Sequence, residues 1–123
     1  MVNLSLNYRV DGQGSPLLMV HGFGISFNIW SSLLSSLRSH FTVIMVELPG
    51  IGSSPISGQA YLEEAVCGLE RVREQLGIEK WHVFSYSSGT RVAEKYIQMH
   101  PSQVERAVFL CPVQISASRA FAL

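Results

Sequence analysis

Five residues near the middle of the chain have the types and spacing of a serine nucleophile on a sharp turn. They read Ser85-Tyr86-Ser87-Ser88-Gly89, after a short apolar run and before a helical pattern. In a Gly-x-Ser-x-Gly turn between a strand and a helix, the central hydroxyl stands above the sheet and attacks an acyl carbon. The residues two before and two after that serine must be small, as Ser85 and Gly89 are. The pattern therefore predicts Ser87 as the nucleophile of an acyl transfer.

A serine-rich turn that only caps a helix is the alternative interpretation, because serine is a favoured residue at helix N-termini. Two further motifs favour the interpretation of Ser87 as a nucleophile. His21-Gly22-Phe23-Gly24 follows the apolar run 17–20, and the segment from Glu47 to Ser54 follows the apolar run 41–46. In an open sheet of parallel strands, ligands lie beyond the carboxyl ends of the strands. All three motifs are therefore expected at one edge of the sheet.

Two backbone amides are candidates for an oxyanion hole. The N–H of Ser88, at a helix start, would face negative charge that forms beside Ser87. The N–H of Phe23 is the second candidate, because Gly22 and Gly24 let the backbone approach a ligand closely. An ordinary glycine-rich turn is the alternative there. The residues expected to shape the site are His21, Gly22, Gly24, Ser85, Tyr86 and Gly89.

None of the four histidines is predicted to act as the base. His21 precedes the oxyanion loop and is expected to order that loop by hydrogen bonding. His40 and His100 are expected at the ends of helices, and His82 lies within a predicted strand. Glu47 is predicted to anchor its loop rather than to serve as a carboxylate of the site.

The elements that would hold these motifs alternate between strands and helices. Alternating apolar and polar residues predict a strand over 4–10, and apolar runs predict strands over 17–20, 41–46, 81–84 and 104–111. Helical spacing predicts helices over 30–37, 62–76 and 89–97. This alternation is typical of βαβ units, so we expect an α/β fold with a mostly parallel sheet and helices on both faces. Residues 1–112 are predicted to form one domain, and residues 113–123 a tail.

Composition narrows the function classes. Apolar residues make up 47% and charged residues 15% of the 123, which excludes a disordered chain. The formal net charge is zero, and no Lys/Arg run supports binding to nucleic acid or to a membrane surface. No stretch approaches the ~20 apolar residues of a membrane span. We expect a cytoplasmic protein with two reduced, buried thiols, Cys67 and Cys111, whose spacing fits no metal site.

Together these motifs resemble the α/β-hydrolase superfamily, in its esterase- and lipase-like branch. The likeness rests on residues 21–24, 47–54, 85–89 and His100-Pro101 with the strand that follows, and it spans about Leu4 to Pro112. It covers only the first half of such a family member. The resemblance implies Ser87 as nucleophile, Phe23 and Ser88 as oxyanion donors, a small-molecule ester or other acyl substrate, and no metal or organic cofactor. Ser85 stands where the family usually has glycine, and Glu47 where aspartate is commoner.

One departure from the family decides the expected activity. The family's catalytic acid and histidine follow later strands, whereas only eleven residues follow Pro112, with no Asp, Glu or His among them. We therefore expect a truncated core that lacks the last strands and the lid and has little or no activity alone. The last strand, 104–111, would form an open apolar edge that favours self-association. Two alternatives stay open: a half-enzyme completed by a second chain or a swapped homodimer, and a non-enzymatic binding module.

Overall fold

The computed structural model of the chain describes residues 6–21, 31–50, 54 and 60–112. Within these ranges the strands are β1 (Tyr8–Gly12), β2 (Ser15–Val20), β3 (Phe41–Val46), β4 (Trp81–Tyr86) and β5 (Val104–Leu110). The helices are α1 (Ser31–Leu37), α2 (Tyr61–Gln75) and α3 (Gly89–Met99), followed by a 3₁₀ turn, η2 (Pro101–Gln103). The predicted tail, 113–123, lies outside the described residues.

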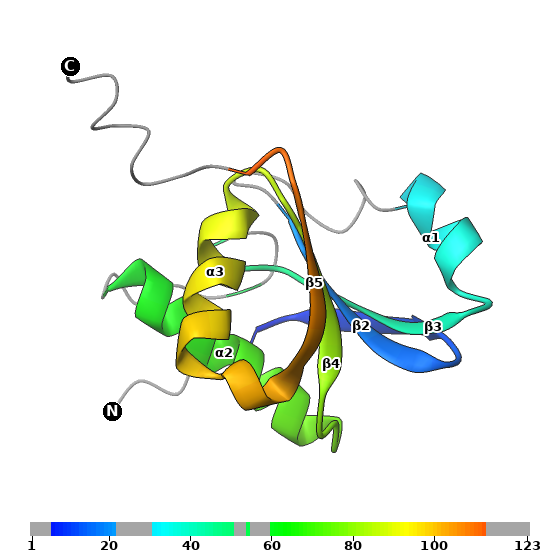
Figure 1. Cartoon of the computed structure of the whole chain (residues 1–123), viewed down its shortest axis with the longest axis horizontal. Coiled ribbons are helices and arrows are strands. Elements are labelled where there is room, and N and C mark those ends of the chain that lie inside the picture. The colour runs from blue at the N-terminus through cyan, green and yellow to red at the C-terminus, as the bar shows by residue number, and fades with distance from the viewer. Residues whose placement is uncertain (1–5, 22–30, 51–53, 55–59, 113–123) are drawn as a thin grey trace.

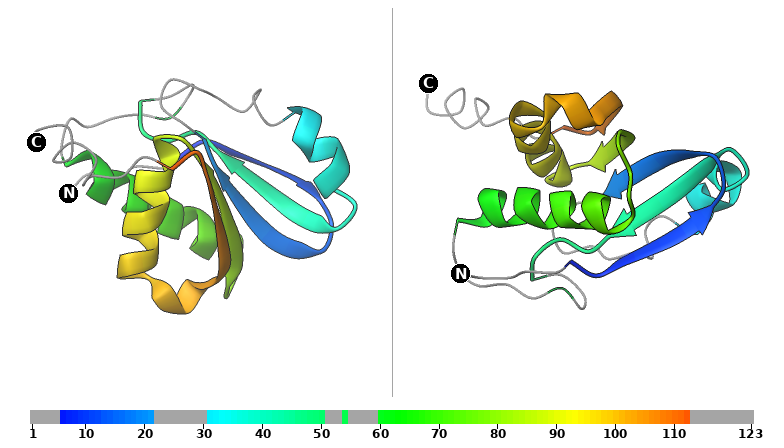
Figure 2. Two further views of the ribbon diagram at one scale, coloured as in Figure 1. Left: turned by 45° about the horizontal axis from the view of Figure 1, so that its top comes forward. Right: turned by 90° about the horizontal axis from the view of Figure 1, so that it is seen from below.

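The strands form one sheet in the order β1-β3-β2-β4-β5. Only β1 runs antiparallel to its neighbour, and the other three pairings are parallel. Helices α2 and α3 cover one face of the sheet, and α1 lies on the other (Figures 1 and 2). The α/β fold expected from the sequence is therefore confirmed, as a mostly parallel sheet with helices on both faces.

The two faces of the sheet are not equally well covered. On the side of α2 and α3, Trp81 and Tyr96 are the largest of the fully buried side chains, and Leu69 joins them. The cluster under α1 is smaller, with Met19 and Met45 among its buried members. Burying a large apolar side chain stabilises the fold by roughly 1.5–3 kcal/mol. We therefore expect the larger core, on the side of the sheet where α3 packs, to contribute more to the stability of the fold.

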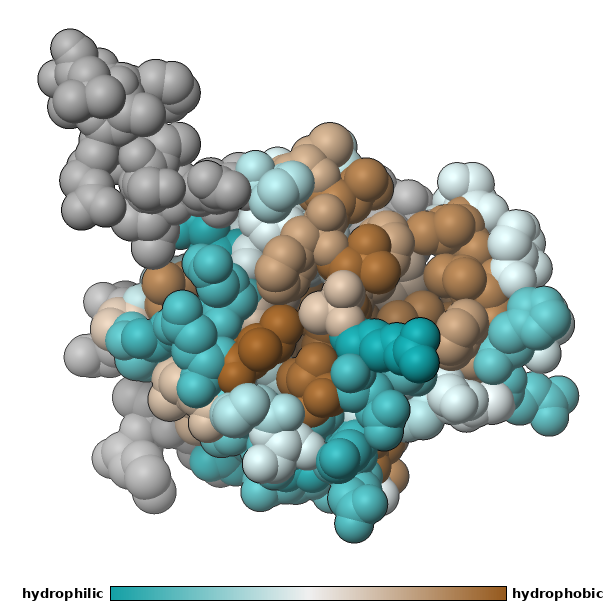
Figure 3. Space-filling model, viewed as in Figure 1, coloured by the Kyte–Doolittle hydropathy of each residue, from teal (hydrophilic) through white to brown (hydrophobic). Residues whose placement is uncertain are grey.

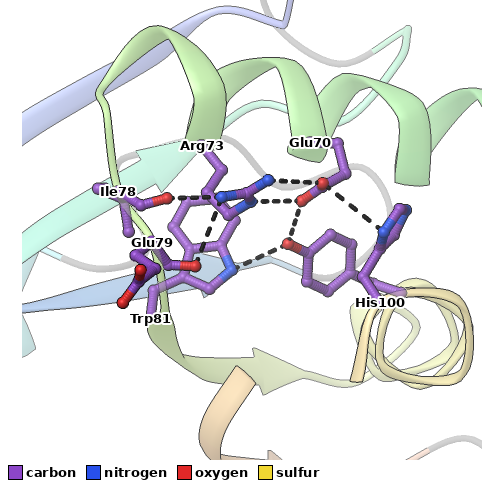
Figure 4. A network of polar contacts seen from close by, with 7 residues as sticks. Glu70, Arg73, Ile78, Glu79, Trp81 and His100 are labelled. Carbon is purple, nitrogen blue, oxygen red and sulfur yellow. Dashed lines mark hydrogen bonds and ion pairs between the residues drawn. The ribbon is translucent and has the colours of Figure 1, made fainter. Parts of the chain in front are cut away.

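A polar network ties α2, α3 and β4 together within the larger core (Figure 4). The Tyr96 hydroxyl donates to Glu70 Oε1 at 2.6 Å and accepts a hydrogen bond from Trp81 Nε1 at 3.1 Å. Arg73 donates to both carboxylate oxygens of Glu70, at 2.6 and 2.9 Å. Burial and the Glu70 carboxylate raise the pKa of Tyr96, so its hydroxyl stays protonated and remains a donor. This network fixes the position of α3 relative to β4.

Three local expectations need correction. β1 runs from Tyr8 to Gly12 rather than over 4–10, because its pairing with β3 continues to Gly12, opposite Thr42. Cys67 and Cys111 are free but exposed, not buried, since one lies on the outer side of α2 and the other follows an edge strand. His40 was expected at the end of a helix, but α1 ends at Leu37, three residues before it. Among the described residues, no helix is long and apolar enough to cross a bilayer.

Candidate active site

Ser87 sits in the turn that joins β4 to α3, and its backbone is left-handed. Its φ is +54°, a value that residues other than glycine rarely adopt. Residues held in such conformations cluster at active sites, where the surrounding structure maintains them. Ser87 as a residue is also partly exposed. Its position between a strand and a helix is the one that the sequence motif predicts.

Backbone and side-chain hydrogen bonds hold this conformation. The Ser87 N–H donates to the Leu110 carbonyl, at the end of β5, at 2.9 Å. The Ser87 carbonyl accepts from the N–H of Thr90 at 3.0 Å and from its hydroxyl at 2.6 Å. Neither Leu110 nor Thr90 was predicted from the sequence as a partner of Ser87. A threonine three residues after the turn is a recognisable local cap signal, whereas nothing in the sequence indicates the contact with Leu110.

The small residues on either side of Ser87 have different physical roles. A Cβ atom on Gly89 would lie 2.1 Å from the carbonyl oxygen of His21, so only glycine lets α3 start directly against the end of β2. Ser85 is fully buried, and its hydroxyl donates to the Val108 carbonyl on β5 at 3.3 Å. The close approach of the chain at position 89 to His21 therefore explains why a residue without a side chain is needed there.

The sheet brings the three sequence motifs to one edge. Val20, the last residue of β2, is in register with Val46 of β3 and with Ser85 of β4. The residues that follow these strands, His21, Glu47 and Ser87, therefore emerge at the same edge. Tyr86, the last residue of β4, packs on the α1 side of the sheet. The predicted oxyanion loop, Gly22, Phe23 and Gly24, lies outside the described residues.

His21 is fully buried and faces the loop after β3. Its Nε2 accepts a hydrogen bond from the Leu48 N–H at 2.9 Å. That bond occupies the lone pair of Nε2, so the ring is neutral with its proton on Nδ1. The loop that His21 orders through this bond is the one after β3. A lone pair engaged in this way is not available to take a proton from Ser87.

The other three histidines lie far from Ser87. His82 is near the start of β4, about 13 Å from the carboxyl end of that strand at the usual rise per residue. His100 ends α3, about 16 Å from the start of that helix. His40 precedes β3 and is therefore at the opposite edge of the sheet. None of them is placed to serve as a base for Ser87.

Glu47 is buried and holds two segments together. Its Oε1 accepts a hydrogen bond from the Asn7 side chain at 2.9 Å, and its carbonyl accepts one from the Ser54 hydroxyl. The same hydroxyl accepts from the Asn7 N–H at 2.8 Å. These bonds are consistent with the predicted role of Glu47 as a loop anchor. Across the described residues, no three His, Cys, Asp or Glu side chains gather into a metal site.

A cavity of about 500 Å³ adjoins the turn that carries Ser87. Its walls come from the loop after β3, the start of α2 and the first turn of α3. The residues that line it are Leu48, Tyr61, Leu62, Ser88, Arg91 and Val92. Ser88, the predicted oxyanion donor, is the first residue before α3 and is partly exposed. The site thus combines a left-handed serine, a helix start and an adjoining cavity.

Known proteins are similar to this chain in sequence. A family model of the alpha/beta hydrolase fold matches residues 15–122. A pimeloyl-[acyl-carrier protein] methyl ester esterase of Aeromonas hydrophila is 29% identical over 105 residues, which are 85% of this chain and 41% of that protein. The protein of the same name from Klebsiella pneumoniae is 36% identical over 103 residues, covering 82% of this chain and 38% of its own length.

Solved structures agree with the sequence comparisons. An esterase from a marine microorganism superposes on 87% of this chain with a TM-score of 0.83 and 25% identity, and the match covers 41% of that esterase. A hydrolase from Pseudomonas aeruginosa, at 23% identity, shares the fold over 98% of this chain with a TM-score of 0.81, covering 51% of the hydrolase. The chain thus spans about two fifths to one half of the proteins compared here.

Proposed function

Because this chain belongs to the α/β-hydrolase family, we propose that it carries the nucleophile side of a serine hydrolase site and that Ser87 attacks a carboxylic ester. The observation that supports this most is the left-handed backbone of Ser87 in the turn between β4 and α3. The relatives named as methyl ester esterases favour an ester among the acyl substrates.

The proposed reaction proceeds through an acyl-enzyme. The Ser87 hydroxyl oxygen forms a bond to the ester carbonyl carbon while its proton passes to a base, and the carbonyl electrons move onto the oxygen. The N–H groups of Ser88 and Phe23 are the proposed donors to that oxyanion. Collapse of the tetrahedral intermediate releases the alcohol, and attack by water then releases the acid and restores the Ser87 hydroxyl.

The base is the part of this reaction that the described residues do not supply. His21 is engaged with Leu48, and the other three histidines lie far from Ser87. Loss of the histidine in a serine hydrolase costs on the order of 10⁶ in kcat, which is about 8 kcal/mol of transition-state stabilisation. An oxyanion hole and substrate binding still give roughly 10³–10⁴ over the reaction in water. We therefore expect little ester hydrolysis from this chain alone.

Covalent labelling with a fluorophosphonate, followed by peptide mapping, tests the identity of the nucleophile. We expect slow modification of the wild-type chain, confined to Ser87, and none in Ser87→Ala. Ser88→Ala is the matched control, because it removes the neighbouring hydroxyl but keeps the backbone N–H. Modification that persists in Ser87→Ala, or that maps to another residue, would contradict the proposal.

A second candidate function is a half-site completed by another chain, and the edge strand β5 favours it. Its residues Val108, Phe109 and Leu110 are 52%, 42% and 45% exposed. An unpaired strand edge with apolar side chains invites pairing with a further strand. If this candidate is right, the specific activity towards a p-nitrophenyl ester rises with protein concentration. Sedimentation velocity should show dimers over the same range of concentrations. Turnover by a strictly monomeric chain would rule it out.

A non-enzymatic binding role is the remaining alternative. It predicts that Ser87→Ala leaves the biological effect of the chain unchanged, whereas both catalytic proposals predict that the effect is lost.

A further inference from the structure

The cavity beside Ser88 has one charged lining residue, Arg91, and this residue lies where a cation is unfavourable. Arg91 is in the first turn of α3, which contains no acidic residue. The partial positive charge at a helix N-terminus disfavours a cation there. Within the described ranges, no ion pair uses the Arg91 guanidinium, and its side chain is exposed. The charge thus has no role in the fold that the structure shows.

The rest of the cavity suits an aliphatic chain. Leu48, Leu62 and Val92 give it apolar walls, and its volume of about 500 Å³ is within the usual range for small-molecule sites. Tyr61 adds a hydroxyl at the start of α2. Burial, together with the charge of Glu64, raises the pKa of Tyr61, so this hydroxyl is protonated at neutral pH and can donate a hydrogen bond.

The cavity also lies within reach of the proposed reaction. Ser88 belongs to both, as a lining residue and as the proposed oxyanion donor. Arg91 also lines the cavity and follows Ser88 by three residues, a little under one helical turn. We therefore expect a short acyl chain attached at Ser87 to extend past Ser88 into this cavity, where Arg91 is the charged lining residue.

We propose that this cavity binds the acyl part of the substrate and that Arg91 selects acyl groups with a carboxylate at their far end. The inference rests on the proposed function in so far as the bound group is the acyl half of an ester. It deepens that proposal by naming the substrate class, which is half-esters of short dicarboxylic acids. The guanidinium and the Tyr61 hydroxyl are the proposed donors to the terminal carboxylate.

A matched pair of ligands isolates the charge. Monomethyl adipate carries a terminal carboxylate, and methyl adipamate replaces it with a neutral amide of similar shape. Their dissociation constants are measured by titrating the wild-type chain and following the backbone amide shifts of Ser88 and Val92. We expect the acid to bind about fivefold more tightly than the amide, which corresponds to about 1 kcal/mol.

Variants of α3 assign that preference to a residue. In Arg91→Gln the ratio of the two dissociation constants is expected to fall to near one, and Arg91→Lys is expected to retain part of the preference. The matched control is Lys95→Gln, which removes a cation one turn further along α3, where Lys95 lies 3.9 Å from Glu63 and outside the cavity lining. It is expected to keep the full preference. Because Arg91 is exposed, the preference is also expected to fall as salt is added.

The outcomes separate this inference from the proposed function. Equal binding of the two ligands, binding of neither, or a preference that is unchanged in Arg91→Gln would overturn the inference. A preference that depends on Arg91 in a chain whose Ser87 is not labelled by a fluorophosphonate would keep the binding site and refute the proposed chemistry. Labelling of Ser87 without any preference for the charged ligand would support the proposed chemistry and refute the proposed binding site.

Discussion

Strands β4 and β5 are neighbours in the sheet, and both contact the turn that carries Ser87, but their surroundings differ. β4 lies between two strands, and its alternate side chains are buried, Trp81 completely. Among the described residues, β5 pairs with a strand on one side only, and every residue from Glu105 to Leu110 is exposed. Apolar side chains accordingly gather at the centre of the face seen in Figure 3, over β5.

The contrast shows that the turn carrying Ser87 is held unequally from its two sides. Ser87 is fixed from the β4 side by the close approach of Gly89 to His21 and by the core around Trp81. From the β5 side it is held by one backbone bond to Leu110. We therefore expect the face covered by α2 and α3 to contribute most to the stability of this turn. Substitutions in the two regions should differ sharply in their effects.

The largest difference is expected between two aromatic truncations. Trp81→Ala empties a fully buried site and removes the hydrogen bond to Tyr96, so it should lower the free energy of unfolding by about 3–5 kcal/mol. Phe109→Ala on β5, where the side chain is 42% exposed, should cost less than about 1 kcal/mol. Urea denaturation followed by far-UV circular dichroism measures both. Similar losses for the two variants would show that β5 is buried in solution.

A smaller effect is expected at Gly89. Alanine there would place its Cβ 2.1 Å from the His21 carbonyl oxygen, so α3 must move away from β2. We expect a loss of about 2–3 kcal/mol, together with slower phosphonylation of Ser87.

Gly77→Ala is the control for the glycine substitution itself. Nothing lies within 4 Å of the added Cβ, but the φ of Gly77 is +67°. The cost should be about 1 kcal/mol, from backbone strain alone, with no change in labelling. Equal costs at Gly77 and Gly89 would mean that the close approach to His21 does not stabilise the turn.

Regular local patterns predicted most of the fold. The apolar run 41–46 coincides with β3, and the helical spacing over 62–76 predicted α2, in which Ala65, Val66, Leu69 and Val72 are buried. The site motif placed Ser87 on a strand–helix turn for the same reason, because its small residues are close in sequence. Contacts between distant residues left no such pattern, so the strand order and the Leu110 bond to Ser87 were not predicted.

The polar network was also missed, because its members look like ordinary helix residues in the sequence. Glu70 and Arg73 are three apart on α2, as in many exposed ion pairs, and only the fold brings Tyr96 of α3 to them. The positive φ of Ser87 is likewise a property of the folded turn. Sequence alone indicates that a small-residue turn is present but not how its backbone is held.

A smaller stability effect than that at Gly89, and one that depends on pH, is expected at Glu70. Burial alone would raise the pKa of this carboxyl, but hydrogen bonds from Arg73 and Tyr96 and the nearby charges of Arg73 and His100 lower it overall. A carboxyl whose pKa is lower in the folded state stabilises the fold above its unfolded pKa of about 4.3, and this contribution is lost as the pH falls through the folded pKa. Glu70→Gln should therefore cost about 1–2 kcal/mol at pH 7 and less below about pH 4.

Glu63→Gln provides the comparison for Glu70 on the same helix. The Glu63 side chain is 58% exposed, whereas that of Glu70 is 15% exposed, and Glu63 lies 3.9 Å from Lys95. Its replacement should change the free energy of unfolding by less than about 0.5 kcal/mol at any of these pH values. A loss at Glu70 that is independent of pH would indicate that packing, and not its charge, is responsible.

We proposed that Ser87 is a positioned nucleophile for which the described residues supply no base. The most direct test is the rate at which a fluorophosphonate modifies Ser87 as imidazole is added to the solution. We predict slow modification without imidazole, a rate that rises in proportion to the imidazole concentration, and no reaction in Ser87→Ala. Rapid modification that is independent of imidazole would show that the chain already supplies a base at Ser87. A serine that stays unmodified at every imidazole concentration would show that the turn does not present a nucleophile.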